Sequence, residues 1–437
     1  MKFTVIRCFV MTLFISGLFS INAQAIASGF QIWEQDGAGV GNVHAGYAAL
    51  ANDASTAFYN PAGITRIKNQ QLVLGAVEVI TSLRYRGNID VSTLGTGPQA
   101  VTAQGGTSIL IPDLHYVAPL SDKAGFGFSI DVPFGLRTDY GRDTIIRYAS
   151  TFTSIKVIDI SPSLGLQVTD KGSIGVGLDI QKMYAEIDNV DTFVSSMLDT
   201  ESESNATDTG YGYHLGWLYQ FTPDTRVGVS YHSQVAHHLS GSSKFIGPLA
   251  DDFNNGPLET SRSIANLTLP AYTAFSMYHR VSPQLAMMGS ILYTQWNVFK
   301  NLVLQHEAGI QDGAASTNID VVIPAYYRNT WFFSFGADYE VSNQVTLRGG
   351  VGYDETPVRN TNRNVALPDN NHYLAALGAH YQATNCLGLD LGWMHVFMKN
   401  ARVNPSPQTM GDQVVSTDGS VNGDANIFGA QITWDIV

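Results

Sequence analysis

Residues 211–232 read YGYHLGWLYQFTPDTRVGVSYH, and this stretch contains the pattern that decides the fold. From Tyr211 to Phe221 a large apolar side chain stands at every second position, and the positions between are mostly small or polar. Pro223-Asp224 is a turn signal, and a second alternating run follows it. Because successive side chains of a β-strand point to opposite faces, the stretch predicts a hairpin whose two strands each have one apolar face.

The same unit repeats along the chain after residue 70, because short turn clusters alternate with long polar stretches. The short clusters are Leu120-Ser121-Asp122-Lys123, Asp170-Lys171-Gly172, Pro223-Asp224, Ser282-Pro283, Ser342-Asn343 and Thr384-Asn385, and the long stretches lie near 87–108, 139–151, 191–207, 241–261, 306–325, 359–369 and 403–423. These six short and seven long connections predict fourteen strands. We expect them near 71–86, 109–119, 124–138, 152–168, 172–190, 208–222, 225–240, 262–281, 284–305, 326–341, 344–358, 370–383, 386–402 and 424–436.

An even number of strands, with short turns at one end and long loops at the other, is typical of bacterial outer-membrane β-barrels. The predicted fold class is therefore all-β, a 14-stranded antiparallel transmembrane barrel over residues 70–437. A soluble β-sandwich would show the same alternation of side chains, but not the asymmetry between turns and loops. We place the chain in the outer membrane of a Gram-negative bacterium, with the short turns periplasmic and the long loops extracellular.

The amino terminus supports this location. Lys2 and Arg7 precede an apolar run from Phe9 to Phe19, which is too short to span a bilayer. Ala23-Gln24-Ala25 matches the small-residue cleavage site of a secretory signal peptide, and cleavage after Ala27 is an alternative. The predicted divisions are a signal peptide at 1–25, an N-terminal hatch at 26–69 and the barrel at 70–437.

Charge and cysteine content exclude several classes of function. Loss of the leader changes the formal net charge from −13 to −15, which disfavours binding to nucleic acid. Cys386 is the single cysteine of the mature chain, so cysteine-based metal sites are excluded. His237-His238 and His306-Glu307 lack a third ligand at a suitable spacing, and no cofactor or metal is expected. The chain has no G-x-S-x-G motif, and Ser230 near His232 is weak support for a lipase, so we do not expect an enzyme.

The stretch 28–68 does not alternate and contains several glycines, which disfavours strand formation. It is long enough to fold inside a barrel as a plug. Asp53 is a candidate helix cap for residues through Phe58, and Pro61 ends that helix. We expect Leu72 and Leu74 of the first strand to pack on this plug; a disordered leader is the alternative interpretation.

Three segments of the chain closely resemble the family of FadL-type long-chain fatty-acid channels. The first is Ser28-Gly29-Phe30-Gln31 followed by Asp53-Ala54-Ser55-Thr56-Ala57-Phe58-Tyr59-Asn60-Pro61-Ala62-Gly63, which is similar to the hatch of that family. The second is Tyr327-Arg328-Asn329-Thr330-Trp331, and the third runs from Gly352-Tyr353-Asp354-Glu355-Thr356-Pro357-Val358 to Leu367-Pro368-Asp369. The resemblance implies passive diffusion of hydrophobic molecules to an inner pocket, a shift of the hatch, and lateral exit through a gap beside a kinked third strand.

The predicted third strand contains Pro133-Phe134-Gly135. Proline cannot donate to a β-ladder and glycine permits a bulge, so the strand is expected to break here beside the strand that follows it. Pro162 of that following strand could remove a second donor at the same seam. A bulge without a functional role is the alternative.

A fatty-acid carboxylate needs an inward-pointing cation. Strand phase places Arg84, Arg328 and Arg348 toward the lumen, and Arg328 is the preferred ligand-binding residue because it lies in a family-like segment. An ion pair between Arg328 and a hatch acid such as Asp53 is the competing interpretation. Asn60, Pro61 and Ala62 are expected to form a rigid turn near the pocket.

The expected partners are a hydrophobic small molecule, outer-membrane lipid and lipopolysaccharide, and the barrel is expected to be a monomer. The sequence leaves the substrate open between long-chain fatty acids and aromatic compounds. The sequences of a general porin and of a structural adhesin barrel would also show alternating strands. The predicted plug argues against an open porin.

Overall fold

The computed structural model describes residues 29–405 and 407–436. The predicted signal peptide at 1–25 and both cleavage sites therefore lie outside the described residues. No helix within the described ranges is long and apolar enough to cross a membrane.

The described chain is mostly strand, and all strands belong to one antiparallel sheet. The strands are β1 (Gln70–Val91), β2 (Gln99–Gln104), β3 (Ser108–Ser121), β4 (Ala124–Asp139), β5 (Phe152–Gln167), β6 (Gly172–Phe193), β7 (Ser195–Thr222), β8 (Thr225–His232), β9 (Val235–Ile246), β10 (Leu258–Leu269), β11 (Tyr272–Arg280), β12 (Leu285–Thr294), β13 (Asn301–Gln311), β14 (Ala314–Pro324), β15 (Thr330–Glu340), β16 (Val345–Asp354), β17 (His372–Thr384), β18 (Leu387–Met398), β19 (Ala401–Val403), β20 (Gln408–Met410) and β21 (Gln413–Ile436).

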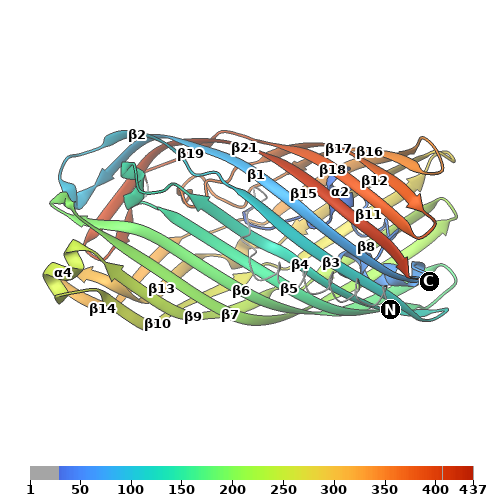
Figure 1. Cartoon of the computed structure of the whole chain (residues 1–437), viewed down its shortest axis with the longest axis horizontal. Helices are drawn as coiled ribbons and strands as arrows, with labels where there is room; N and C mark the ends of the chain where they lie inside the picture. Colours follow the sequence, from blue (N-terminus) through green and yellow to red (C-terminus); the bar gives the residue numbers. More distant parts are fainter. Residues whose placement is uncertain (1–28, 406, 437) are drawn as a thin grey trace, which may run out of the picture.

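The sheet closes on itself because β1 pairs with β21 along its whole length, from Gln70↔Ile436 to Val91↔Val415. Several long strands are interrupted, for example β8 and β9, which both pair with β7. When the pieces of an interrupted strand are counted as one, the strands form a closed 14-stranded barrel. The predicted fold is therefore confirmed. Figure 1 shows the strands tilted to the long axis, with the carboxyl terminus at the end where the short turns lie.

The turn predictions hold at one end of the barrel, but the loops at the other end are shorter than expected. The six short turns occupy the predicted positions, such as Pro223-Asp224 between β7 and β8. In contrast, 191–207 and 306–325 were expected to be loops, and β6 with β7 and β13 with β14 continue through them as hairpins. These polar segments still pair with each other as antiparallel strands. The pairing therefore extends beyond the apolar part of the barrel and gives the backbone N–H and C=O groups their hydrogen bonds.

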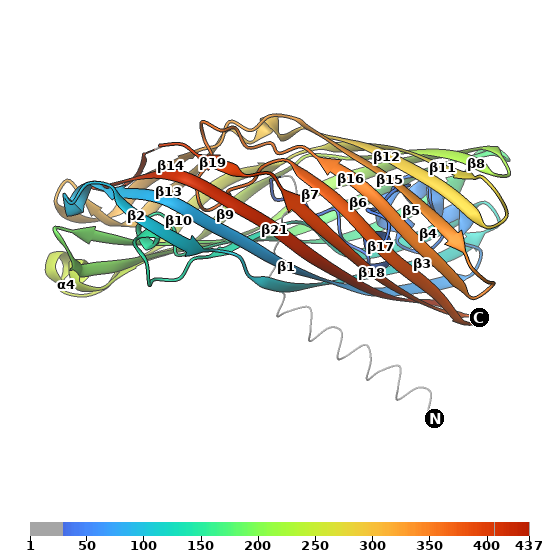
Figure 2. The ribbon, with the colours of Figure 1, turned by 90° about the horizontal axis from the view of Figure 1, so that it is seen from above.

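The helical segments are short: α2 (Gly37–Val40), α3 (Thr56–Tyr59), η1 (Pro61–Arg66), η2 (Ser92–Leu94), η3 (Ile145–Tyr148), α4 (Pro248–Asn254) and η4 (Trp296–Val298). Residues 29–69, here called the inner segment, contain α2, α3 and η1. The helix α2 contacts β17, β18 and β21, whereas η1 contacts β4 to β7 on another part of the wall. Figures 1 and 2 both show the inner segment inside the ring of strands, in the half near the carboxyl terminus.

Contacts with the inner segment identify the face of each strand that points inward. Val73 of β1 packs in a buried cluster with Ala57 and Ile64, so the odd-numbered positions of β1 face the lumen. The expectation that Leu72 and Leu74 face the plug is therefore wrong by one position. The sequence did not show which face of β1 points into the lumen, because polar residues also occupy the outer face of this long strand toward its loop end.

Candidate functional site

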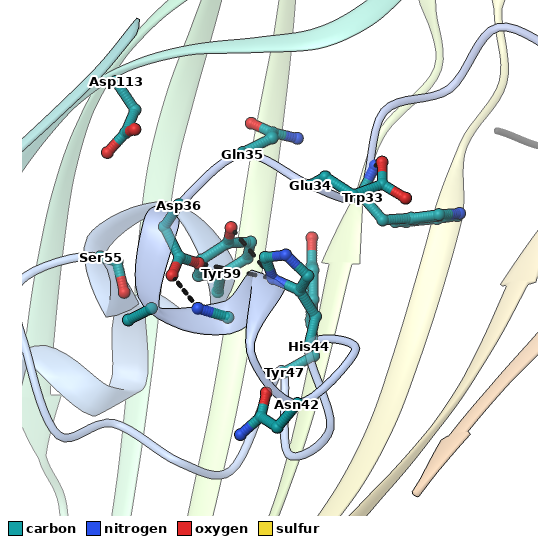
Figure 3. A network of polar contacts seen from close by, with 12 residues as sticks. Trp33, Glu34, Gln35, Asp36, Asn42, His44, Tyr47, Ser55, Tyr59 and Asp113 are labelled. Atoms are coloured by element: carbon teal, nitrogen blue, oxygen red, sulfur yellow. Dashed lines mark hydrogen bonds and ion pairs between the residues drawn. The ribbon is translucent and has the colours of Figure 1, made fainter. Parts of the chain in front are cut away.

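The inner segment begins with a compact polar turn. Asp36 caps α2, accepting from the Gly39 amide at 2.5 Å, and its other oxygen lies 3.4 Å from His44 Nδ1. The hydroxyl of Tyr59 approaches the same imidazole nitrogen at 3.5 Å (Figure 3). Burial alone would raise the pKa of the Asp36 carboxyl, but the charge and hydrogen bond of His44 outweigh burial and lower it. The loop 41–47 is thereby tied to α2 and to α3.

The Asn60-Pro61-Ala62 turn joins the inner segment to the wall. Asn60 is almost fully buried, and its amide donates to the Ala48 carbonyl at 2.5 Å and to the Trp217 carbonyl of β7 at 3.1 Å. Its side-chain oxygen accepts from the Ala62 amide at 3.1 Å and caps η1, where Pro61 fills the first position. One side chain therefore holds two parts of the inner segment against a barrel strand.

The predicted helix cap Asp53 has a different place. The helix α3 begins at Thr56, after Ser55, whose side chain makes no capping bond. Asp53 instead accepts from the Ser55 amide at 3.0 Å and from Gln431 of β21 at 3.2 Å. It links the inner segment to the last strand, and burial raises the pKa of its carboxyl.

The three predicted lumen arginines do not come together. Arg84 is exposed between the inward-facing Leu83 and Tyr85, so it lies on the outer face and the prediction is wrong. Arg328 is also exposed, and its Nε donates to the Thr356 carbonyl at 3.0 Å. Arg328 precedes β15, so the alternation of that strand does not set the direction of its side chain.

Arg348 points inward as predicted, but acidic partners surround it. Its Nη1 lies 2.5 Å from Asp390 Oδ1, its Nε lies 3.6 Å from Asp338 Oδ2, and the Ala38 carbonyl of the inner segment is 3.4 Å away. The guanidinium is therefore a structural ion-pair partner between three wall strands and α2. A ligand carboxylate would have to compete with two carboxylates for it.

The kink at Pro133 opens the wall on one side. In β4, Val132 and Pro133 stand between Asp131↔Asp159 and Phe134↔Val157, so β4 carries one extra residue against β5. The pairing of β4 with β3 stops at Leu114↔Ile130, whereas β3 continues beside β1 up to Ser108. Within the described chain, no ladder joins 108–113 of β3 to 131–138 of β4, and we call this seam the window.

The inner segment takes the place of β3 along the window. The Ile32 amide donates to the Pro133 carbonyl at 2.9 Å, and the Gly135 amide donates to the Phe30 carbonyl at 2.8 Å. Beyond the window, the Asp139 amide donates to the Gly105 carbonyl at 3.0 Å, which closes the seam again. The window is thus bounded at both ends and lined from inside by residues 30–32.

The window lies on the opposite side of β4 from the one that the sequence predicted. The ladder between β4 and β5 continues on both sides of the bulge, so the expected break beside the following strand is wrong. Pro162 pairs with Phe128 inside this unbroken ladder, and its side chain lies on the outer face between the inward-facing Ser161 and Ser163. The missing proline donor marks the position of the break along the strand, but not the neighbour that leaves it.

An aromatic cluster covers the inner side of the window. Phe30 lies 4.8 Å from Trp296 and 6.0 Å from Phe134 between ring centroids, and Phe299 lies 4.8 Å from Tyr327. All five rings are buried. They belong to one apolar cluster that continues along the lumen through Leu136, Ile155, Met183 and Leu239.

Two cavities extend this cluster toward the loop end. The lower one, of about 430 Å³, is lined almost entirely by apolar groups that include Ile155, Met183 and Leu267. The upper one, of about 760 Å³ including its open mouth, reaches Met410 near the loops. Ile187, Ser204 and Leu304 line both, so the cavities adjoin. Both volumes include open space, and the apolar lining of the lower cavity suits a hydrophobic ligand.

Two buried features escaped the sequence prediction. Glu307 of β13 is nearly fully buried and accepts hydrogen bonds from Ser204 and, at 2.5 Å, from Ser263. Asp369, in the connection before β17, accepts from the Gly29 amide at 2.9 Å and from the Thr356 hydroxyl. Burial raises the pKa of the Asp369 carboxyl to about 7. The family-like segment through Leu367-Pro368-Asp369 was a signal for the second feature, whereas Glu307 was considered only beside His306 as a metal ligand, because its neighbours resemble a loop.

The histidines considered as metal ligands have other partners. His237 lies 3.1 Å from Asp208, and His306 lies 2.6 Å from Asn318. Elsewhere in the described residues, Asp179, His214 and His232 lie close enough to hold an ion. However, His214 Nδ1 is 2.6 Å from Asp179 Oδ1, which a hydrogen bond explains, and the two imidazoles are stacked.

Comparisons with known proteins agree with this architecture. The sequence model of the family described as outer membrane protein transport protein (OMPP1/FadL/TodX) matches residues 18–436. The long-chain fatty acid transport protein of Salmonella typhi is 25% identical, over 89% of this chain and 91% of that protein. The crystal structure of a Pseudomonas aeruginosa FadL homologue has a TM-score of 0.83 at 25% identity, covering 93% of this chain and 100% of the other. The toluene transporter TodX of Pseudomonas putida shares the fold, with a TM-score of 0.67 at 17% identity over 94% and 100% of the two chains.

Proposed function

Because the chain belongs to the outer membrane protein transport protein family (OMPP1/FadL/TodX), we propose that it is a passive channel that releases hydrophobic molecules sideways through the window. The family consists of transport proteins for hydrophobic substrates in the Gram-negative outer membrane. The proposal concerns the route: entry at the upper cavity, passage through the lower cavity, and exit between β3 and β4.

One observation carries this proposal: a continuous apolar cluster connects the cavities with the window. The aliphatic side chains of the lower cavity and the aromatic rings behind the window belong to that single cluster. An apolar ligand that leaves the cavity toward the window therefore stays out of water. Outside the window, Leu110 of β3 is 57% exposed on the outer face, so the exit would open on an apolar surface.

Residues 29–69 act as the hatch in this proposal. Residues 30–32 lie along the inner side of the window, and two backbone hydrogen bonds hold them to β4. Breaking these two bonds would release residues 30–32 from β4 and leave the ladders of β4 with β5 and of β3 with β1 in place. The remaining part of the hatch stays anchored through Asn60 to β7.

Closing the window tests the route. Deletion of Pro133 removes the extra residue of the bulge, so Val132 would oppose Ile158 and β4 could pair with β3. We expect uptake of a labelled apolar compound by expressing cells to fall to near background, while binding to the purified protein persists. Pro162→Ala is the control, because it changes an outward proline in an unbroken ladder. Normal uptake by a folded deletion variant would exclude lateral release here.

Ion conductance in planar bilayers separates this channel from a general porin. The inner segment contacts a continuous part of the wall, through α2 on β17, β18, β21 and β1 and through η1 on β3 to β7. We therefore expect little steady conductance from the native protein. A large, steady conductance would favour a general porin.

A further inference from the structure

The upper cavity has an unusual set of ionisable side chains. Asp188, Asp191 and Glu307 line it, and its described lining contains no lysine, arginine or histidine. The lower cavity is lined by no ionisable side chain at all among its described residues. A ligand in these cavities therefore meets carboxyl groups, neutral polar groups and aliphatic carbon, and no cation among the described lining residues.

Glu307 lies where the two cavities meet. Its hydrogen-bond donors are Ser204, which lines both cavities, and Ser263, which lines the lower one. These hydroxyls donate to the carboxyl group of Glu307 and bring no positive charge to it. A second carboxylate in the same buried space would be repelled and would lose its own hydration.

Three arginines with buried side chains, Arg226, Arg348 and Arg363, already have partners. Arg226 donates to the Ala49 and Leu50 carbonyls of the inner segment. Arg348 is paired with Asp390 and Asp338. Arg363 donates to the carbonyls of Asp369 at 2.7 Å and Arg402 at 2.8 Å. Removing one of these cations from its acceptors would leave buried polar groups without hydrogen bonds, which is costly. None of them is available to a ligand carboxylate in the cavities.

We propose that this channel carries uncharged apolar molecules and that Glu307 is a specificity-determining residue that excludes carboxylates. This inference rests on the proposed function, and it narrows the substrate from hydrophobic molecules in general to neutral ones. An ester, alcohol or hydrocarbon carries no net charge and gives up no ionic hydration on entering, whereas a fatty-acid anion carries its charge into an acidic, low-dielectric space.

A matched pair of ligands tests the role of charge. Radiolabelled methyl laurate and laurate have the same chain and differ in charge at pH 8. Equilibrium binding to the full-length mature protein in detergent, corrected for binding to empty micelles, should be at least about tenfold tighter for methyl laurate. Glu307→Gln keeps a hydrogen-bonding group of the same shape, and should tighten laurate binding about fivefold or more with methyl laurate unchanged within about twofold.

Glu259→Gln is the matched control, because Glu259 is an exposed acid of the neighbouring strand β10 that lies near Lys244. This substitution should leave the binding of both laurate and methyl laurate unchanged. The shift of the folded barrel on an unheated gel verifies assembly of each variant, and the wild-type ligand comparison stands without any variant. Laurate binding as tight as that of methyl laurate to the wild type would overturn the inference while leaving the channel function intact. Binding of neither ligand above the micelle background would instead overturn the proposed function, and this inference with it.

Discussion

The two halves of the barrel interior differ in what their walls offer. Toward the short turns, inward positions of the wall are often glycine, as at Gly175 and Gly228, and the inner segment lies directly against them. Toward the loops, inward positions carry aliphatic side chains such as Met183 and Leu239, and cavities remain between them. Alternation is the same in both halves, so it sets which residues face inward, and the size of those residues sets whether the interior is filled by chain or left for a ligand.

Replacing a wall glycine in the filled half should have the largest effect. In Gly228→Val the new Cβ would overlap the Ala48 carbonyl of the inner segment, which accepts a hydrogen bond from the Asn60 amide. Overpacking against backbone costs about 3 kcal/mol or more, so we expect the inner segment to leave its place. Ion conductance in planar bilayers should rise severalfold.

Gly289→Val is the control for this prediction. A Cβ at Gly289 meets only the Ser334 carbonyl, at 3.4 Å, which is an ordinary contact. Low conductance in both variants would mean that the filled half tolerates added volume, and the comparison between the two halves would lose its physical basis.

At the boundary between the halves, the Asp369 carboxyl group accepts a hydrogen bond from the Gly29 amide. The stability of the protein should depend on pH through this carboxyl group. Burial raises the pKa of Asp369 from 3.8 to about 7, so the folded protein keeps this proton between those values while the unfolded chain loses it. The contribution of this proton to the free energy of unfolding is therefore complete below about pH 4, and it is lost as the pH rises to about 7. The loss is on the order of 4 kcal/mol, at 1.36 kcal/mol per pH unit.

Asp369→Asn mimics the neutral carboxyl group and should remove this part of the pH dependence. Thermal unfolding of both proteins in detergent from pH 4 to pH 8 measures the difference. Parallel curves for the two proteins would show that Asp369 does not titrate in this range.

Filling the open half should weaken ligand binding without affecting the plug. Ala265 of β10 is buried and lines the lower cavity, so Ala265→Phe would occupy part of its volume of about 430 Å³. We expect binding of methyl laurate to weaken about tenfold, equivalent to 1.4 kcal/mol. Conductance should remain low, in contrast to Gly228→Val. Ala375→Phe, between the inward-facing Leu374 and Ala376 of β17, adds the same ring to the outer face and should leave binding unchanged.

The barrel was predictable because period-2 alternation and turn residues are local signals. The turn at Pro223-Asp224 and the kink at Pro133 both follow from the backbone chemistry of proline, and the structure has both at the predicted residues. The side on which the wall opens was not predictable, because a missing N–H does not specify which neighbour departs. That outcome depends on Phe30 and Ile32, which compete for the backbone of β4 from far away in the sequence.

The direction of charged side chains was harder to predict than the strands. Arg84 lies in the loop-end part of β1, where the outer face is polar and the inward positions, such as Leu83 and Tyr85, are apolar. The polarity of the two faces is therefore the reverse of the one assumed from a polar lumen. Arg348 was placed correctly in the lumen, but its two acidic partners come from β15 and β18. Such pairs depend on strand register, which a single sequence does not state.

The smallest effect is expected for Arg328, the residue that the sequence favoured as carboxylate ligand. Its side chain is exposed outside both halves of the lumen, and its Nε hydrogen bond to the Thr356 carbonyl is the kind of surface contact that contributes little. Arg328→Ala should therefore change the binding of laurate and of methyl laurate by less than about twofold, and stability by less than about 0.5 kcal/mol. A tenfold loss confined to laurate would show that the guanidinium reaches the ligand, which would require the segment before β15 to turn inward when a ligand binds. That result would break the division of the interior into a filled half and an acidic open half, because the ligand itself would then bring a cation into the open one.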